Sequence, residues 1–201
     1  GIFVNGDFNL HFADYKVLPG IPGCCPGYES GTGFGISGGL FYSFRLADKW
    51  ELALRAIYSD LSGTLSKTEP MYVSGLDGKG VNGEFEHSIK AKLASVGIMP
   101  LAGFRMSDPL TLHFGIRAGY LMGKTIEQKE EIITPDFGVF TDTRKRTRNE
   151  FNGDLPGASA IEAAVVLGAS YAIPLNQAFT WFLAPEVFFA YGITPVSSDL
   201  N

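Results

Sequence analysis

The feature that most constrains this chain is a regular alternation of large apolar residues with small or polar ones. It is clearest between Gly33 and Leu46, where one parity is apolar: Phe34, Ile36, Leu40, Tyr42, Phe44 and Leu46. The other parity carries mostly Gly and Ser, with Arg45 near the end. Because successive side chains of a β-strand point to opposite faces, this segment predicts a strand with two chemically different faces.

The same alternation recurs and predicts seven strands, at about residues 2–13, 33–46, 50–59, 85–106, 110–122, 161–171 and 179–191. The connections between them alternate in length. The long polar ones are predicted at 17–32, 65–82 and 127–157, and the short ones at 47–49, 107–109 and 174–177. Within 85–106 the apolar parity changes, which predicts a β-bulge near Leu93.

A meander of such strands with alternating short and long connections is typical of an up-and-down β-barrel that spans a membrane. We therefore expect an all-β, antiparallel, eight-stranded transmembrane barrel that occupies residues 1–201 as a single domain, with seven strands visible. Because such barrels close with an even number of strands, we expect the natural chain to continue beyond Asn201 with the closing strand. Any periplasmic domain would also lie outside this sequence.

Composition narrows the classes of function. The 201 residues carry a net charge of −5, so the chain lacks the basic surface that nucleic-acid binding requires. No run approaches the roughly 18 consecutive apolar residues of a membrane-spanning helix, so a membrane-embedded chain would have to span as strands. No Ser-His-Asp arrangement is apparent, and the glycines at 31–35 lead into a strand rather than a helix, so we expect no enzymatic activity.

Two interpretations of the alternation compete. In a soluble barrel of the lipocalin kind the apolar parity is the core and encloses a small ligand. In a membrane barrel the apolar parity faces lipid. The second is favoured because the other parity is dominated by Gly, Ala and Ser with single charges. It is also favoured by aromatic residues near the predicted strand ends, as two interfacial girdles require, for example Trp50, Trp181, Tyr58 and Tyr120.

The charged residues of the small-residue parity would lie in the lumen and would have to pair there. They are Asp7, Glu51, Glu162 and Glu186 among the acids and Arg45, Arg55, Arg105 and Arg117 among the bases. Such a network is either a structural plug of ion pairs or a gate of a narrow ion path. The plug is favoured because so small a barrel is filled by side chains. His11 and His113 share this parity without metal-ligand spacing, so we expect neither a metal nor another cofactor.

Two loop features have their own alternatives. Cys24 and Cys25 are adjacent in the first long loop, and in an exported protein they predict a vicinal disulfide that stiffens the loop. The alternative is a redox-labile or soft-metal-binding pair. The basic run from Arg144 to Arg148 is either a solvated loop segment or a contact for anionic lipopolysaccharide or a partner.

The meander from Ile2 to Gly192 resembles the eight-stranded barrel domain of proteins similar to outer membrane protein A. The first loop, with Cys24-Cys25-Pro26 followed by the segment 29–33, is similar to barrels of the Bacteroidetes and Chlorobi kind. The resemblance implies a bacterial outer-membrane location, with the bilayer and lipopolysaccharide as partners and other envelope proteins bound through the long loops. It implies structural anchoring and surface exposure, with weak pore activity as a secondary expectation.

Overall fold

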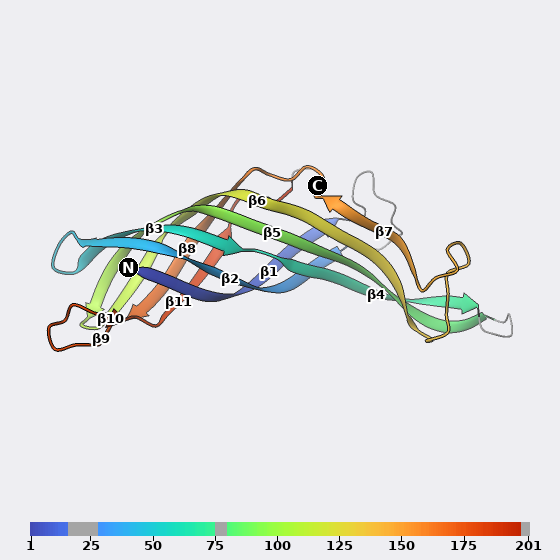
Figure 1. Cartoon of the computed structure of the whole chain (residues 1–201), viewed down its shortest axis with the longest axis horizontal. Helices are drawn as coiled ribbons and strands as arrows, with labels where there is room; N and C mark the ends of the chain where they lie inside the picture. The colour runs from blue at the N-terminus through green and yellow to red at the C-terminus, as the bar shows by residue number, and fades with distance from the viewer. Residues whose placement is uncertain (16–27, 75–79, 198–201) are drawn as a thin grey trace.

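The structure is a computed structural model that describes residues 1–15, 28–74 and 80–197, and it forms an elongated, strongly curved sheet (Figure 1). The strands in chain order are β1 (Ile2–Tyr15), β2 (Tyr28–Arg45), β3 (Trp50–Asp60), β4 (Gly63–Ser74), β5 (Gly80–Ser107), β6 (Leu110–Thr134), β7 (Thr147–Asp154), β8 (Ile161–Tyr171), β9 (Ile173–Pro174), β10 (Phe182–Leu183) and β11 (Glu186–Gly192). The predicted all-β class is confirmed.

The main sheet is an antiparallel meander in which the strands follow the order β1-β2-β3-β5-β6-β8-β11. The connections from β2 to β3 and from β5 to β6 are tight, at the predicted positions. Where the strands pair, an inward-facing residue on one strand opposes an inward-facing residue on the next, as Arg55 on β3 opposes Met99 on β5. The seven predicted strands correspond in order to β1, β2, β3, β5, β6, β8 and β11, with bounds that differ most for the last one.

The prediction of long loops at 65–82 and 127–157 is wrong, because more than half of each segment is strand. The first, 65–82, contains most of β4 and the beginning of β5. The whole of β4 pairs with residues 80–91 of β5, from Gly63↔Ala91 to Ser74↔Gly80. The second, 127–157, contains the end of β6 and all of β7, which pair from Thr125↔Asp154 onward. Together β4, residues 80–93 of β5, residues 124–134 of β6 and β7 form a sheet extension beyond the main meander, at the right of Figure 1.

The predicted bulge lies at the base of this extension, but its extra residue is in β6. Ala94 pairs with Gly123 and Ser95 pairs with Leu121, so Met122 has no partner on β5. On β5 the buried parity runs without a break from Phe85 to Leu101. On β6 the buried parity changes from odd positions, such as Leu121, to even positions, such as Ile126. What changes along β5 is therefore the chemistry of its two faces, and this mimics a change of parity in the sequence.

The predicted last strand, 179–191, is also corrected. The strand β11 begins only at Glu186, directly after Pro185, and the chain before it leaves the main sheet. Residues 173–183 form a separate hairpin in which β9 and β10 pair through Phe182↔Pro174 and Leu183↔Ile173. The alternation of Phe179, Trp181 and Leu183 is real, but it belongs to this hairpin.

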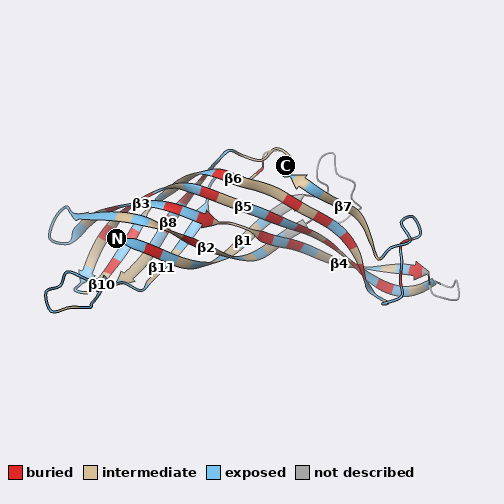
Figure 2. Ribbon diagram, viewed as in Figure 1, coloured by how far each residue is buried: buried red, intermediate tan, exposed pale blue. Residues whose placement is uncertain are grey.

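Buried and exposed residues alternate along the long strands (Figure 2). The buried apolar side chains form three clusters on the concave face of the sheet. One lies within the main meander around Phe3, Ile57, Met99, Leu101 and Val166. The second, at the base of the extension, contains Leu65, Ile89, Leu93, Ile126 and Leu155, and the third, in the outer part of the extension, contains Val73, Phe85, Ile132 and Phe140.

Candidate functional site

The outer face of the main meander is apolar. The large side chains there are between 39 % and 83 % exposed, with Phe34 at the upper end of that range and Leu112 at the lower end. We call this surface the apolar belt, and it consists of Ile2, Val4, Phe8, Leu10, Phe34, Ile36, Leu40, Tyr42, Phe44, Leu54, Tyr58, Val96, Ile98, Leu112, Phe114, Ile116, Tyr120, Ile161, Val165, Leu167, Tyr171, Val187, Phe189 and Tyr191. Exposed apolar patches of this extent are rare on soluble monomers.

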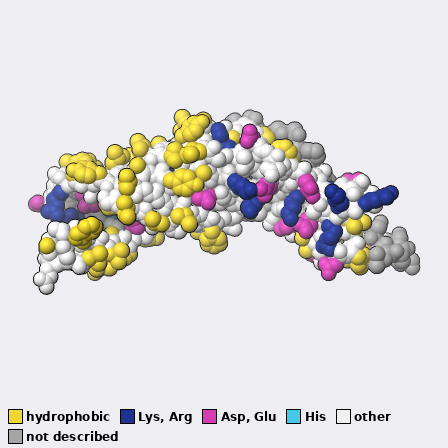
Figure 3. Space-filling view, in the orientation of Figure 1, with side chains coloured by type: hydrophobic (Ala, Val, Ile, Leu, Met, Phe, Trp, Pro, Cys, Tyr) yellow, Lys and Arg dark blue, Asp and Glu magenta, His cyan; other side chains and the backbone are white. Residues whose placement is uncertain are grey.

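The chemistry of the outer face changes where the extension begins. On β5 the outward residues are Val96 and Ile98 within the belt, and Lys90 and Lys92 only a few positions away. Charged side chains gather over the extension, while hydrophobic side chains spread over the main meander (Figure 3). The inner face is mixed in both parts, because the main meander buries an apolar cluster around Leu101 beside its charged residues, and the extension buries Glu130 beside apolar residues such as Ile89. The extension therefore has the outer face of a water-soluble sheet, whereas the outer face of the main meander is apolar.

The interior of the main meander holds ion pairs between charged residues that the sequence predicted to lie there. Arg55 on β3 and Glu186 on β11 form a two-point ion pair, with Nη1 2.8 Å from Oε1 and Nη2 2.7 Å from Oε2. Both side chains are about nine-tenths buried. The guanidinium lies over aromatic rings, 4.7 Å from the centroids of Phe3 and Phe188. Buried charges of this kind are tolerated only when they are paired and hydrogen-bonded.

A second pair lies deeper along the strands. Arg117 Nε on β6 is 3.1 Å from Glu162 Oε1 on β8, and Ser95 Oγ on β5 donates to the same carboxylate oxygen at 3.3 Å. Asp7 on β1 accepts a hydrogen bond from Ser37 Oγ on β2 at 3.1 Å. Asp7 makes no ion pair within the described ranges. The Glu162 carboxylate therefore links β8 to β5 and β6, and the Asp7 carboxylate links β1 to β2.

The last predicted residues lie near the end of the meander that carries the tight turns. Arg105 is 3.6 Å from Glu51 and 3.7 Å from Asp108, which are longer contacts at more exposed side chains. Arg45 is exposed there, and in the part of the chain that the structure describes it has no ion pair. Of the eight predicted residues, six therefore form the three pairs Arg55–Glu186, Arg117–Glu162 and Arg105–Glu51.

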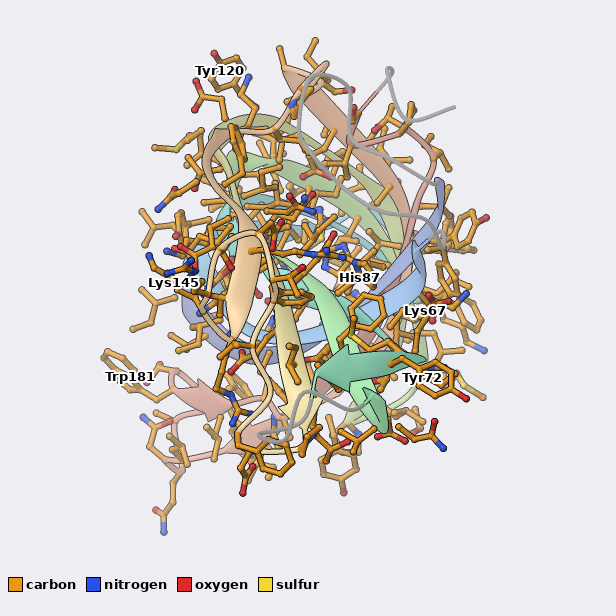
Figure 4. The ribbon with its side chains drawn as sticks, turned by 90° about the vertical axis from the view of Figure 1, so that its right-hand side faces the viewer. Lys67, Tyr72, His87, Tyr120, Lys145 and Trp181 are labelled. Carbon is orange, nitrogen blue, oxygen red and sulfur yellow. The ribbon has the colours of Figure 1, made fainter. Side chains whose placement is uncertain are left out.

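A further charged cluster, in the extension, was not predicted. Glu130 on β6 is almost fully buried and accepts hydrogen bonds from Arg148 Nε at 2.7 Å and Asn149 Nδ2 at 2.8 Å, both on β7. His87 Nδ1 on β5 lies 3.3 Å from Glu130 Oε1. Burial of the imidazole lowers the pKa of His87. His87 lies at the centre of the view along the molecule in Figure 4. The alternation of Ile126, Gln128 and Glu130 would have signalled a strand, but the charges led to the prediction of a loop.

This cluster also changes the interpretation of the basic run. Arg148 binds Glu130 and lies 4.2 Å over the ring of Phe140. Arg146 donates to the backbone carbonyl of Ile132 at 2.6 Å and also contacts Asp136. Arg144 and Lys145, by contrast, are exposed. Two of the cations in the run therefore hold the extension together.

A cavity of about 1340 Å³ opens at the tight-turn end of the main meander, and all seven strands of the meander contribute to its lining. Its lining includes residues 2–6 of β1, residues 183–186 around the start of β11, and interior residues such as Arg55 and His113. With its amide oriented to donate, Asn5 on β1 bonds Glu186 Oε1 on β11 at 3.1 Å, so the two strands approach each other here. Within the described sheet, however, β1 pairs only with β2 and β11 only with β8.

The remaining sequence predictions concern metals and cysteines. Among the described residues no group of three or more His, Cys, Asp or Glu side chains could hold a metal ion. His113 Nε2 hydrogen-bonds Ser170 Oγ at 2.8 Å, and His11 is partly buried at the far end of β1. Cys24 and Cys25 lie outside the described residues. In the part of the chain that is described, no helix is long and apolar enough to cross a membrane.

Comparison with known proteins assigns no relative. No protein-family model, no curated protein and no solved structure matches this chain.

Proposed function

We propose that the chain is a bacterial outer-membrane β-barrel that acts as a structural anchor and displays the sheet extension at the cell surface. The observation that carries this proposal is the apolar outer face of the main meander, which surrounds an interior that holds ion pairs beside an apolar cluster. Full burial of one large apolar side chain stabilises a fold by about 1.5–3 kcal/mol, so leaving a whole belt in water is very unfavourable. Lipid tails remove that cost.

The boundary of the belt supports the same proposal. Lys90 and Lys92 follow directly on the apolar positions of β5, and on β6 Lys124 reaches over the ring of Tyr120 at 5.9 Å. A tyrosine with its ring toward hydrocarbon and a lysine on the water side is the arrangement expected at a membrane interface. The extension beyond it carries polar outward side chains and an apolar interior, as a sheet in water requires.

The proposal includes closure by an eighth strand. The strands β1 and β11 run in the same direction, because six antiparallel steps separate them in the sheet. Each has one edge unpaired within the described sheet, and unpaired backbone groups are very costly in hydrocarbon. One strand antiparallel to both would satisfy both edges and would fill the opening beside Asn5 and Glu186.

Anchoring is favoured over conduction because the interior is filled between the cavity at the tight-turn end and the extension. The Arg55–Glu186 pair is packed among Phe3, Phe41 and Phe188. Farther toward the extension, apolar clusters fill the base of the extension and its outer part. Weak pore activity remains a secondary proposal that conductance across planar bilayers tests. Lipopolysaccharide and other envelope proteins are the proposed partners of the extension, with exposed Arg144 and Lys145 available to anionic groups.

The second candidate is a soluble barrel that carries a small ligand. The cavity of about 1340 Å³ favours it, since a carrier needs such a space. The two candidates differ in the solvent they need. We expect the full-length protein to aggregate in detergent-free buffer, to gain β-structure by circular dichroism in micelles or vesicles, and to float with the vesicles in a density gradient. A monomeric, folded protein in detergent-free buffer that binds an apolar probe stoichiometrically would instead support the carrier.

A further inference from the structure

The hairpin at residues 173–183 is the one connection at the tight-turn end that is neither short nor charged. The other two turns at this end contain charged residues, Asp48 and Lys49 in one and Asp108 in the other. Residues 172–185 contain no charged residue at all. The hairpin lies beside the start of β11 at the lower left of Figure 1.

Polar bonds within the hairpin fix its shape. The Asn176 side chain accepts hydrogen bonds from the backbone N–H of Thr180 at 2.9 Å and of Trp181 at 3.2 Å, and it donates to Thr180 Oγ1 at 2.6 Å. The N–H of Leu175 donates to the carbonyl of Trp181 at 2.8 Å. The turn is therefore held without burying its large apolar side chains.

Those side chains are exposed. Trp181 is 72 % exposed, and Leu175, Phe179, Phe182 and Leu183 are all more than half exposed. In the view along the molecule Trp181 lies at the periphery, away from the central axis (Figure 4). Phe179, Phe182 and Leu183 also border the cavity at the tight-turn end, whereas Leu175 and Trp181 are not part of its lining. A rigid, uncharged turn that leaves Leu175 and Trp181 exposed outside the cavity indicates a surface with a partner.

We propose that this hairpin is a membrane-interface anchor that inserts its aromatic and aliphatic side chains into the headgroup and upper acyl region of the bilayer. The inference rests on the proposed function. The bilayer is the occupant that the surroundings favour, because the hairpin continues the apolar belt from Leu167 through Tyr171 to Ile173 along one line of chain. Tryptophan and tyrosine prefer this interfacial zone, and the lack of charge removes the main cost of entering it.

The chain offers a matched test, because Trp50 and Trp181 are its only tryptophans. Trp50 lies in β3 at the edge of the belt and reports insertion of the main sheet. Each of the variants W50F and W181F leaves a single tryptophan within residues 1–201, and any tryptophan elsewhere in the full-length protein is replaced by phenylalanine. Within the described part of the chain, the structure records no side-chain hydrogen bond of Trp50 or Trp181, so neither substitution removes one there. The full-length proteins are reconstituted into vesicles of phosphatidylcholine with and without lipids brominated near the headgroup end of the acyl chains.

If the proposal is right, Trp181 in W50F emits at shorter wavelength in vesicles than in denaturant and loses fluorescence in brominated vesicles to an extent comparable to Trp50 in W181F. The added substitution Leu175→Asp should reverse both effects at Trp181. Quenching of Trp50 without quenching of Trp181 would overturn the anchor and leave the membrane barrel standing. If neither tryptophan is quenched, both proposals fail.

Discussion

Arg55 and Glu186 are joined by two parallel hydrogen bonds although their strands, β3 and β11, are not neighbours in the sheet. The pair spans the concave side of the sheet, so it fixes how far the sheet curls. It also brings the start of β11 next to β1, where Asn5 reaches the same carboxylate. The pair therefore connects the curvature of the sheet to the position of its two unpaired edges.

The first prediction concerns this pair. Arg55→Ala leaves the Glu186 carboxylate buried without its partner, and we expect it to lower the free energy of unfolding by about 3–5 kcal/mol. Replacing both residues by apolar ones, Arg55→Met with Glu186→Leu, should restore most of that loss because no charge remains buried. Urea unfolding of the reconstituted protein, followed by circular dichroism, measures both. A double variant as unstable as Arg55→Ala would contradict the assignment.

The second prediction uses two glycines of paired strands. A Cβ at Gly39 on β2 would overlap the backbone carbonyl of Ala56 on β3, whereas a Cβ at Gly6 on β1 meets nothing within 4 Å. We expect Gly39→Ala to destabilise the fold by about 1–3 kcal/mol, since a backbone atom cannot rotate away. Gly6→Ala is the control and should change stability by less than about 1 kcal/mol. Equal effects of the two substitutions would show that β2 and β3 do not approach this closely.

The third prediction concerns pH. Burial is the main reason that the pKa of His87 lies below its ordinary value of 6.5, and Arg148 on β7 adds to it, while Glu130 on β6 and Glu69 on β4 oppose it. The unfolded chain therefore takes up a proton at higher pH than the folded chain does. The contribution of neutral His87 is fully present above pH 6.5 and is lost as the pH falls below that value.

We accordingly expect faster hydrogen exchange of backbone amides in residues 84–93 and 124–134 as the pH is lowered below 6.5, after correction for intrinsic exchange rates. His87→Gln should abolish most of this dependence. If protection of the extension instead increased on acidification, the Glu130 carboxylate would be the dominant influence on His87 and the direction of the pKa shift would be wrong.

The fourth prediction separates the cations of the basic run. Arg148→Ala removes a charge-assisted hydrogen bond to buried Glu130 and the contact with Phe140, so we expect a loss of about 2 kcal/mol in local stability of β7. Arg144→Ala is the matched control, because Arg144 is exposed, and it should stay within about 0.5 kcal/mol of the parent. Amide exchange of residues 147–154 measures both.

The sequence predicted the main strands because period-two alternation is a direct consequence of strand geometry. The interior positions of Arg55, Arg117, Glu162 and Glu186 followed from the same parity. The extension was missed because its outer face is charged and its inner face is apolar, which is the opposite of the pattern that defined the other strands. Glu130 shows the difficulty best, since a buried glutamate between charged neighbours looks like part of a solvated loop until Arg148 and His87 are placed beside it.

The last strand was misplaced for a different reason. The alternation of Phe179, Trp181 and Leu183 has the period of a strand, but Pro185 and the Asn176 turn separate that segment from β11. Alternation shows that a segment is extended, and it does not show which sheet the segment joins. The position of the extra residue at Met122 was hidden similarly, because a bulge on β6 and a change of environment along β5 produce the same sequence pattern.

The most direct test follows the outer face of one strand across the proposed membrane boundary, with one inner-face position as a control. Single nitroxide labels are placed at Lys90, Val96, Ile98 and Met99 of β5, in a Cys24→Ser, Cys25→Ser background of the full-length protein in lipid vesicles. Collision rates with oxygen, which concentrates in lipid, and with a water-soluble nickel complex give the environment of each label. We predict nickel access at Lys90, oxygen access without nickel access at Val96 and Ile98, and low access to both at Met99. Nickel access at Val96 and Ile98 equal to that at Lys90 would contradict a membrane-spanning sheet.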